Sequence, residues 1–183
     1  MGNDHSMLLK QDGSLWATGK NTYGQLGDRS RSDKMTFTKV YFSGVKAAAA
    51  GRDYSMLLKH DGSVWATGRN NHGQLGDGTR ISWTRFVQVV PTSGVRAVAT
   101  GGYHSMMLKQ DGSVWSAGSN SFGQLGMGLL SEDSLVFYKV IESGVKALAP
   151  GCLHSLVARQ DGSVWATGRN LFGQLGDGST NQV

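Results

Sequence analysis

The chain has a single cysteine, Cys152, among its 183 residues, and this scarcity excludes two classes of protein. One thiol can form neither an intramolecular disulfide framework nor the thiolate cluster of a structural metal site. No run of about 18 apolar residues is present to cross a bilayer, and the N-terminus lacks the layout of a signal peptide. We therefore expect a cytoplasmic or nuclear protein without a membrane partner.

Proline is nearly as scarce, with 2 residues, whereas glycine supplies 27. This balance is typical of short strands joined by many tight turns, and it is unusual for long helices or proline-rich disorder. The composition therefore favours an all-β fold.

A repeat dominates the sequence. Residues 5–27, 54–76, 104–126 and 154–176 align without gaps. The tryptophans of these segments, 49, 50 and 50 residues apart, are Trp16, Trp65, Trp115 and Trp165. We treat the chain as one repeat array, with repeats at approximately 1–44, 45–94, 95–144 and 145–183.

Each repeat is predicted to form four antiparallel strands, which make one propeller blade. Residues 6–10 and 15–19 read as a hairpin because the intervening Asp12-Gly13 supplies the positive φ of a tight turn. The alanine-rich runs 45–51, 95–101 and 145–151 are too short for stable helices, and small side chains suit a crowded inner strand. Residues 36–42 and 86–90 are expected to form outer strands.

A single sheet of this kind cannot bury both of its faces, so stability must come from stacking blade on blade. We expect the four tryptophans to be buried between neighbouring sheets. Truncating one of them would then cost about 3–5 kcal/mol.

The repeat text His-Ser-x-x-Leu-Lys-x-Asp-Gly-x-Val-Trp-x-x-Gly-x-Asn-x-x-Gly-Gln-Leu-Gly closely resembles the regulator of chromosome condensation (RCC1-like) repeat. The resemblance covers essentially the whole chain. Its Gly-Gln-Leu-Gly signature begins and ends with glycine in every copy, at Gly24, Gly27, Gly73, Gly76, Gly123, Gly126, Gly173 and Gly176.

The resemblance implies a β-propeller, typically of seven blades, and a role that varies within the family. Members include a nuclear exchange factor for a Ras-like GTPase, a plant ultraviolet-B photoreceptor, a bacterial β-lactamase inhibitor and domains of HECT-type ubiquitin ligases. The chain departs from the common Val-Tyr-x-Trp-Gly pattern, since tryptophan comes first and Thr18, Thr67 or Thr167 follows. That departure weakens the photoreceptor interpretation, and no insertion like the exchange factor's catalytic wedge is found.

The repeats provide about 3.5–4 blades, which predicts a partial ring or half of a shared ring. Propellers usually contain four to eight blades, and closure removes exposed sheet edges. Either the chain is a segment of a longer protein, which we favour, or two copies form a head-to-tail homodimer that completes a ring.

No catalytic, cofactor-binding or metal-binding residue is predicted. His5, His104 and His154 occur once in three of the four repeats, and Tyr54 replaces the histidine in the second, so hydrogen bonding to a neighbouring strand explains them better than a metal site does. The glycines around Lys20 lack the lysine and hydroxyl of a phosphate-binding loop. Cys152 has no identifiable base and is expected to be a buried or half-buried thiol.

A net charge of +5 leaves room for an acidic partner. Solvated surface is the better explanation for the recurring cations, which include Lys10, Lys59, Lys109 and Arg159. Variable loops at 29–34, 80–85 and 129–134 would carry partner specificity. Together the phased cations and these loops give the candidate partner-binding residues Lys20, Arg69, Arg169, Arg29, Arg80 and Arg85.

The function that we expect is a non-catalytic protein-interaction scaffold, and a segment of a larger regulatory or ubiquitin-ligase protein is one setting for it. One alternative is a guanine-nucleotide exchange factor for a small GTPase. Another is a chromatin- or DNA-associated propeller, since nucleic acid remains a possible partner.

Overall fold

The computed structural model describes residues 2–41, 43–91, 94–128 and 132–181. These residues form 14 β-strands, and they contain no helix that is long and apolar enough to span a membrane. The prediction of an all-β fold is confirmed. The strands are β1 (His5–Leu9), β2 (Leu15–Gly19), β3 (Lys34–Tyr41), β4 (Val45–Ala50), β5 (Tyr54–Lys59), β6 (Val64–Gly68), β7 (Trp83–Val90), β8 (Val95–Thr100), β9 (His104–Lys109), β10 (Val114–Gly118), β11 (Ser134–Ile141), β12 (Val145–Pro150), β13 (His154–Arg159) and β14 (Val164–Gly168).

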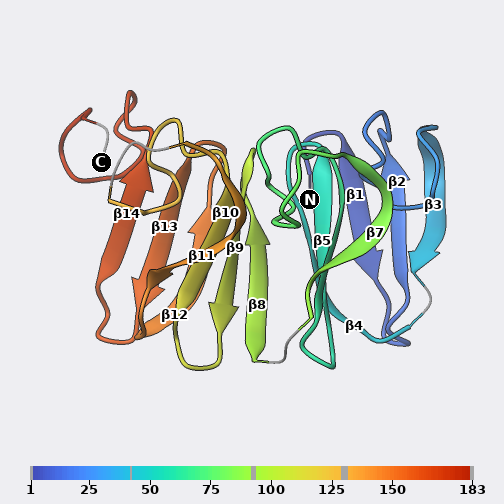
Figure 1. Ribbon diagram of the computed structural model, residues 1–183, viewed down its shortest axis with the longest axis horizontal. Coiled ribbons are helices and arrows are strands. Elements are labelled where there is room, and N and C mark those ends of the chain that lie inside the picture. The colour runs from blue at the N-terminus through green and yellow to red at the C-terminus, as the bar shows by residue number, and fades with distance from the viewer. Residues whose placement is uncertain (1, 42, 92–93, 129–131, 182–183) are drawn as a thin grey trace.

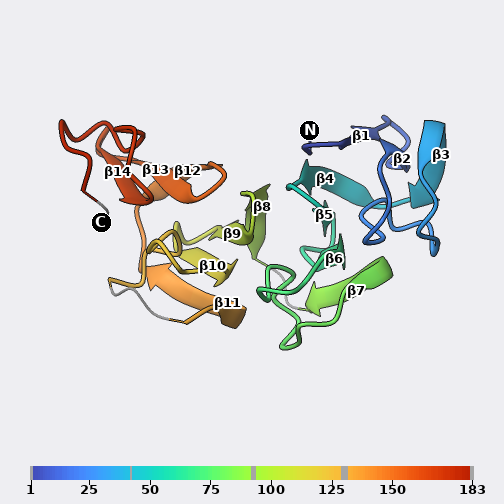
Figure 2. The same cartoon turned by 90° about the horizontal axis from the view of Figure 1, so that it is seen from above.

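The strands form four antiparallel sheets, here called blades 1 to 4. Blade 2 has the order β4-β5-β6-β7 and blade 3 the order β8-β9-β10-β11. Blade 1 comprises β1-β2-β3 and blade 4 comprises β12-β13-β14. Seen from above, the blades follow one another round an arc, with β4, β8 and β12 on its inner side and β3, β7 and β11 on its outer side (Figure 2). The predicted partial propeller is confirmed, and the described residues give four strands to blades 2 and 3 and three strands to blades 1 and 4.

The predicted inner strands are present as β4, β8 and β12, and the first hairpin as β1 and β2. The outer strands begin earlier than predicted, at Lys34 in β3 and at Trp83 in β7. Irregular pairing accounts for the difference, because a register shift between Ala66 and Gly68 lets Gly68 pair with Trp83. Phe42, included in the prediction, lies outside the described residues.

The aspartates of the hairpins act as turn residues, as predicted. The Asp61 carboxylate accepts hydrogen bonds from the backbone amide of Ser63 at 2.9 Å and from its hydroxyl at 2.6 Å. Gly62 between them has a φ of +83°. Because these hydrogen bonds stabilise the charged carboxylate, they lower the pKa of Asp61. These Asp-Gly turns therefore join the two central strands at one end of each blade.

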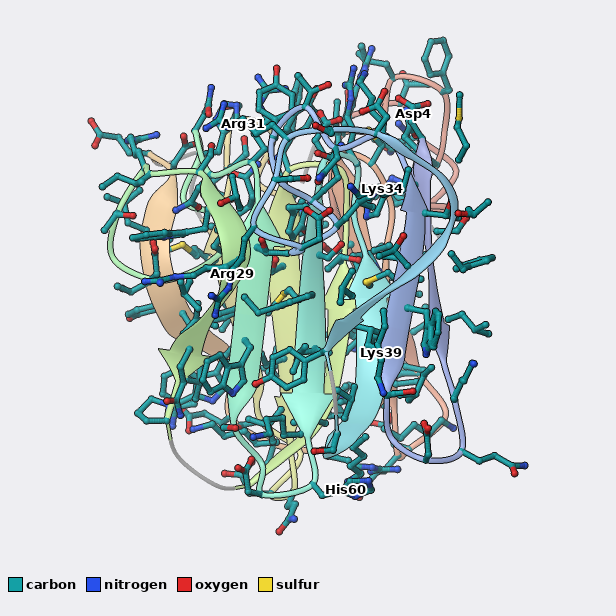
Figure 3. The ribbon with its side chains drawn as sticks, turned by 90° about the vertical axis from the view of Figure 1, so that its right-hand side faces the viewer. Asp4, Arg29, Arg31, Lys34, Lys39 and His60 are labelled. Atoms are coloured by element: carbon teal, nitrogen blue, oxygen red, sulfur yellow. The ribbon has the colours of Figure 1, made fainter. Side chains whose placement is uncertain are left out.

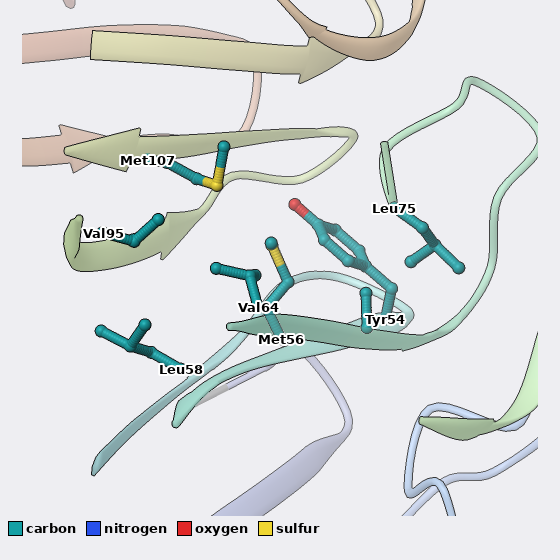
Figure 4. Close-up of a cluster of buried hydrophobic side chains, with 8 residues drawn as sticks. Tyr54, Met56, Leu58, Val64, Leu75, Val95 and Met107 are labelled. Carbon is teal, nitrogen blue, oxygen red and sulfur yellow. The ribbon is translucent and has the colours of Figure 1, made fainter. Parts of the chain in front are cut away.

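The core lies between blades. Tyr54, Met56 and Leu58 of β5 point out of blade 2 towards blade 3, where Val95 and Met107 pack against them (Figure 4). All five side chains are buried. Each sheet is therefore stabilised by apolar burial against its neighbour, as the repeat predicted.

The burial predicted for the four tryptophans is wrong, because each is only half-buried or exposed. Trp65 donates from Nε1 to the hydroxyl of Ser63 at 3.0 Å, which holds its polar edge at the hairpin turn. A lysine at the end of the preceding strand covers a ring face: Lys109 Nζ lies 4.1 Å from the centre of the Trp115 ring, and Lys10 Nζ lies 4.0 Å from that of Trp16. Because the rings are only partly buried, the expected cost of truncation falls to about 2 kcal/mol, a figure that includes the loss of the cation–π contact.

The signature glycines allow adjacent blades to pack closely. A Cβ placed on Gly76 would lie 2.4 Å from the ring of Phe137, which belongs to the outer strand of the next blade. Gly27 has the same relation to Phe86, at 2.5 Å. Both glycines also have a φ of +74°. The last glycine of the first two signatures therefore serves the turn and leaves space for the phenylalanine of the next blade.

Candidate functional site

The two ends of the strands carry different loops (Figure 1). The loops that follow β2, β6, β10 and β14, together with the short segments before β1, β5, β9 and β13, gather at one end, here called the signature-loop face. Asp4 and Arg31 lie at this end, whereas His60 lies at the opposite end with the hairpin turns (Figure 3). The long and variable connections are therefore on the signature-loop face.

A buried asparagine holds each loop in a fixed shape. The Asn70 amide donates to the Asp77 carboxylate at 3.0 Å and to the carbonyl of Thr79 at 3.0 Å. Its carbonyl oxygen accepts the backbone amide of Leu75 at 3.0 Å. Asn21 and Asn170 make the corresponding contacts in their own blades. The face is therefore a rigid surface, which lowers the entropy that binding costs.

The recurring histidines link neighbouring blades beneath this face. His104 Nε2 lies 2.7 Å from the hydroxyl of Ser155, which donates to the carbonyl of Gln124 at 2.7 Å. Since that hydroxyl proton is already used, His104 must donate from Nε2. His5 and Ser55 repeat the arrangement at 2.8 Å, and burial lowers the pKa of both histidines to about 4. The described residues contain no group of side chains that could hold a metal ion.

A cluster of arginines and tyrosines crosses the middle of the signature-loop face. The members, named here the Arg–Tyr cluster, come from blades 1, 2 and 3 and are Tyr23, Arg52, Asp53, Arg69, His72, Arg80, Tyr103 and Asp133. Tyr103 is at its centre: the guanidinium carbons of Arg52 and Arg69 lie 5.1 and 5.9 Å from its ring. Arg52 also donates a hydrogen bond to the Tyr103 hydroxyl.

Two aspartates hold the cationic members of the cluster in place. Asp53 is buried and lies 3.4 Å from Arg69 and 3.9 Å from Arg52. Asp133 lies 3.0 Å from His72 and 3.1 Å from Arg80. Three arginines against two aspartates leave the cluster cationic at neutral pH. Arg52 and Arg80 keep about half of their side-chain surface exposed.

The structure brings together two of the six predicted partner-binding residues. Arg69 and Arg80 both belong to the Arg–Tyr cluster, where His72, Tyr103 and Asp133 connect them. The others lie apart from it. Lys20 pairs with Asp4 at 3.5 Å, Arg169 stacks on Phe122 and Phe172, Arg85 lies over Trp83, and Arg29 is exposed with a φ of +69°.

Sequence reasoning missed Arg52, Tyr103, Tyr23 and His72. One signal was available: an aromatic or imidazole ring follows three residues after each phased cation position, as Tyr23 follows Lys20. Arg69 stacks on Tyr23 of the preceding blade at 4.9 Å, and Arg169 stacks on Phe122 of its preceding blade at 5.6 Å. The pattern therefore encodes contacts between blades.

A cavity of about 300 Å³ opens on the inner side of the arc, beside the cluster. It is lined mainly by glycines and by the ends of the inner strands, with Arg52 as its charged residue. Cys152 is at its rim and is exposed, so the expectation of a buried or half-buried thiol is wrong. No second group suited to thiol chemistry stands among the lining residues.

One model of the regulator of chromosome condensation (RCC1) repeat matches residues 1–25, 45–74 and 95–124, and a second model of the same repeat matches residues 61–108. A search of curated proteins finds no match. Among solved structures, yeast RCC1 (Prp20) bound to Kap60 is 23% identical, with a TM-score of 0.89 over 100% of this chain and 46% of that chain.

Human WBSCR16 is also 23% identical, with a TM-score of 0.86 over 100% of this chain and 50% of that chain. A second structure of Prp20p from Saccharomyces cerevisiae, described with its binding properties to Gsp1p and histones, is 23% identical, with a TM-score of 0.85. The match covers 100% of this chain and 47% of the Prp20p chain. The chain thus spans about half the length of these structures, and at this identity they show the shared fold. The matched repeats, the signature glycines and the blade architecture together establish that the chain belongs to the RCC1 repeat family.

Proposed function

We propose that the chain is a non-catalytic protein-interaction scaffold whose Arg–Tyr cluster docks an acidic segment of a partner protein. The observation that carries the proposal is the position of Tyr103 between Arg52 and Arg69 on a rigid surface. Tyrosine and arginine are the residue types most enriched, with tryptophan, at the energetic centres of protein interfaces.

The charge of the cluster supports an acidic partner. Arg52 and Arg80 retain exposed guanidinium surface, while their aspartate partners hold them in one geometry. The whole chain also carries +5, which speeds the encounter with an acidic surface and slows that with a basic one. The variable loops contribute Arg80 and Asp133, so specificity for the partner would reside in them.

The test is binding of a fluorescent oligoglutamate peptide, followed by anisotropy at low ionic strength. We expect Arg80→Glu and Tyr103→Ala to weaken binding by about tenfold each, equivalent to about 1.4 kcal/mol. Arg85→Glu is the matched control, because it changes the charge equally but lies over Trp83, outside the cluster. Equal weakening by all three variants would show only a diffuse charge effect and would contradict the proposal.

Duplex DNA is the second probe in the same assay. The proposal predicts that the peptide binds more tightly than DNA of equal charge. Tighter binding of DNA, with an affinity that falls steeply as salt rises, would favour the chromatin-associated alternative instead.

A second candidate function is nucleotide exchange on a small GTPase. The fold similarity to Prp20p, which was described with its binding to Gsp1p, favours testing it. Release of labelled guanine nucleotide from a panel of small GTPases is the direct measurement. Accelerated release would establish exchange activity and remove the non-catalytic assignment.

We propose the cytoplasm or the nucleus as the site of action, since the single cysteine suits a reducing compartment. A second copy of the chain, in a head-to-tail homodimer, is a further proposed partner. Residence within a larger regulatory or ubiquitin-ligase protein is compatible with the scaffold role.

A further inference from the structure

His72 is the one member of the Arg–Tyr cluster whose residue type changes charge near neutral pH. Histidine titrates between about pH 5 and pH 8, whereas arginine stays charged and aspartate stays ionised throughout that range. The side chain of His72 is 36% exposed, so its ring can exchange protons with solvent. The histidines beneath the face differ, because burial lowers the pKa of His5 and His104 to about 4 and keeps both neutral near pH 7.

The Asp133 carboxylate fixes which ring nitrogen of His72 carries the proton. Nδ1 lies 3.0 Å from Asp133 Oδ2, and an ionised carboxylate can only accept a hydrogen bond. Nδ1 therefore donates, and the lone pair of the neutral ring is on Nε2. This nitrogen makes no hydrogen bond with another of the described residues. A second proton can thus be added at Nε2 while the bond to Asp133 stays in place.

The same carboxylate oxygen also holds Arg80. Arg80 Nη1 lies 3.1 Å from Asp133 Oδ2, so one negative charge faces a permanent cation and a titratable one. While His72 is neutral, the carboxylate and the guanidinium compensate each other. Once His72 is charged, two cations share the carboxylate, and one positive charge is left over. Because the Asp133 side chain is only 15% exposed, solvent screens this charge weakly.

The other charged groups around His72 keep their own charge over the same pH range. The Tyr103 ring packs edge-on against the imidazole, with ring centroids 5.4 Å apart. Across that ring lie the guanidinium groups of Arg52 and Arg69, which are permanent cations. Glu132 is exposed on the loop that carries the aspartate and stays ionised. Three arginines and two aspartates give the cluster a charge of +1, and protonation of His72 makes it +2.

We infer that protonation of His72 controls the affinity of the Arg–Tyr cluster for its acidic partner, so that the partner binds more tightly at about pH 6 than at about pH 8. The inference rests on the proposed function of this cluster. The imidazolium adds a positive charge beside the half-exposed Arg80. It also presents Nε2–H as a new donor for a carboxylate of the partner. One added charge at a partly exposed site changes affinity by about threefold.

NMR of the ring nitrogens in the free, isotope-labelled chain tests the proton positions without any partner. We expect the His72 ring to carry its proton on Nδ1 at about pH 8 and to gain a second proton on Nε2 as the pH falls to about 6. A ring protonated on Nε2 alone at about pH 8 would overturn the inference. So would a ring that is still neutral at about pH 6.

Anisotropy of the fluorescent oligoglutamate peptide at about pH 8 and about pH 6, at constant ionic strength, measures the effect on binding. Glutamate stays ionised between these values, so the charge of the probe is constant. The unchanged chain should bind about threefold more tightly at the lower pH. His72→Gln, whose amide can still donate to Asp133 but carries no charge, should bind equally at both. His60→Gln is the matched control and should keep the full change, because His60 is exposed at the opposite end (Figure 3).

The outcomes separate this inference from the proposed function. If the unchanged chain binds with the same affinity at both pH values, or if the pH effect survives in His72→Gln, the inference is wrong and the docking of an acidic segment stands. If the effect is lost in His60→Gln, it does not come from the cluster, and the inference is again wrong. Absence of binding at both pH values would remove the proposed function and the inference together. Far-UV circular dichroism at each pH confirms that every variant is folded.

Discussion

Substituting Gly76 by alanine should destabilise the protein through the interface between blades 2 and 3. At a φ of +74°, any L-side chain costs about 1–2 kcal/mol. The added Cβ would also lie 2.4 Å from the Phe137 ring, and displacing a packed side chain costs about 1–3 kcal/mol more. The expected total is about 2–5 kcal/mol.

Gly176→Ala is the matched control for this experiment. Its φ of +71° imposes the same backbone strain, but no described atom lies within 4 Å of the added Cβ. We expect it to cost about 1–2 kcal/mol. The difference between the two variants therefore isolates the contact between blades.

Urea denaturation followed by tryptophan fluorescence gives both free energies of unfolding. Phe137→Leu should relieve part of the Gly76→Ala loss, giving a coupling of about 1 kcal/mol between the two sites. Equal losses at Gly76 and Gly176, with no coupling to Phe137, would refute the role assigned to the signature glycine.

Three further predictions concern the histidines, the loops and the tryptophans. Burial lowers the pKa of His104 from 6.5 to about 4, so the unfolded chain binds more protons in this range; stability is therefore full above about pH 6.5 and falls as the pH drops towards 4. His104→Tyr, which copies Tyr54 of the second repeat, should shift acid unfolding to lower pH, and an unchanged acid midpoint would contradict the assignment. Asn70→Ala should cost about 2–3 kcal/mol and accelerate hydrogen exchange at the Leu75 amide, whereas the exposed Asn71→Ala should do neither. Trp115→Ala should lower the free energy of unfolding, measured by chemical denaturation, by about 2 kcal/mol. A loss above about 4 kcal/mol would instead match a fully buried tryptophan and contradict the partial burial described above.

Much of the fold could be predicted because the same turn residues and strand patterns recur in every repeat. The recurring Asp-Gly pairs located the hairpins, and the alanine-rich runs located the inner strands. The tryptophans were misplaced because a large apolar ring was assumed to be buried, whereas Ser113 and Lys109 hold Trp115 at the hairpin-turn end.

The candidate site was harder to predict because its central residues do not recur. Arg52 stands where the other repeats have Asn3, Gly102 and Cys152, and Tyr103 stands where they have Asp4, Asp53 and Leu153. Because the residue at these positions differs from repeat to repeat, an alignment of the repeats gives no sign that they form a site. Only the stacking of blades brings Arg52 and Tyr103 into contact, so their pairing depends on tertiary structure.

The most direct test of the account is an NMR titration of the isotope-labelled chain with oligoglutamate, read residue by residue. The account predicts that the largest amide shifts occur at Arg52, Arg69 and Tyr103 on the signature-loop face. Shifts concentrated at the opposite end, around the turns of Asp61 and Asp111, would contradict it.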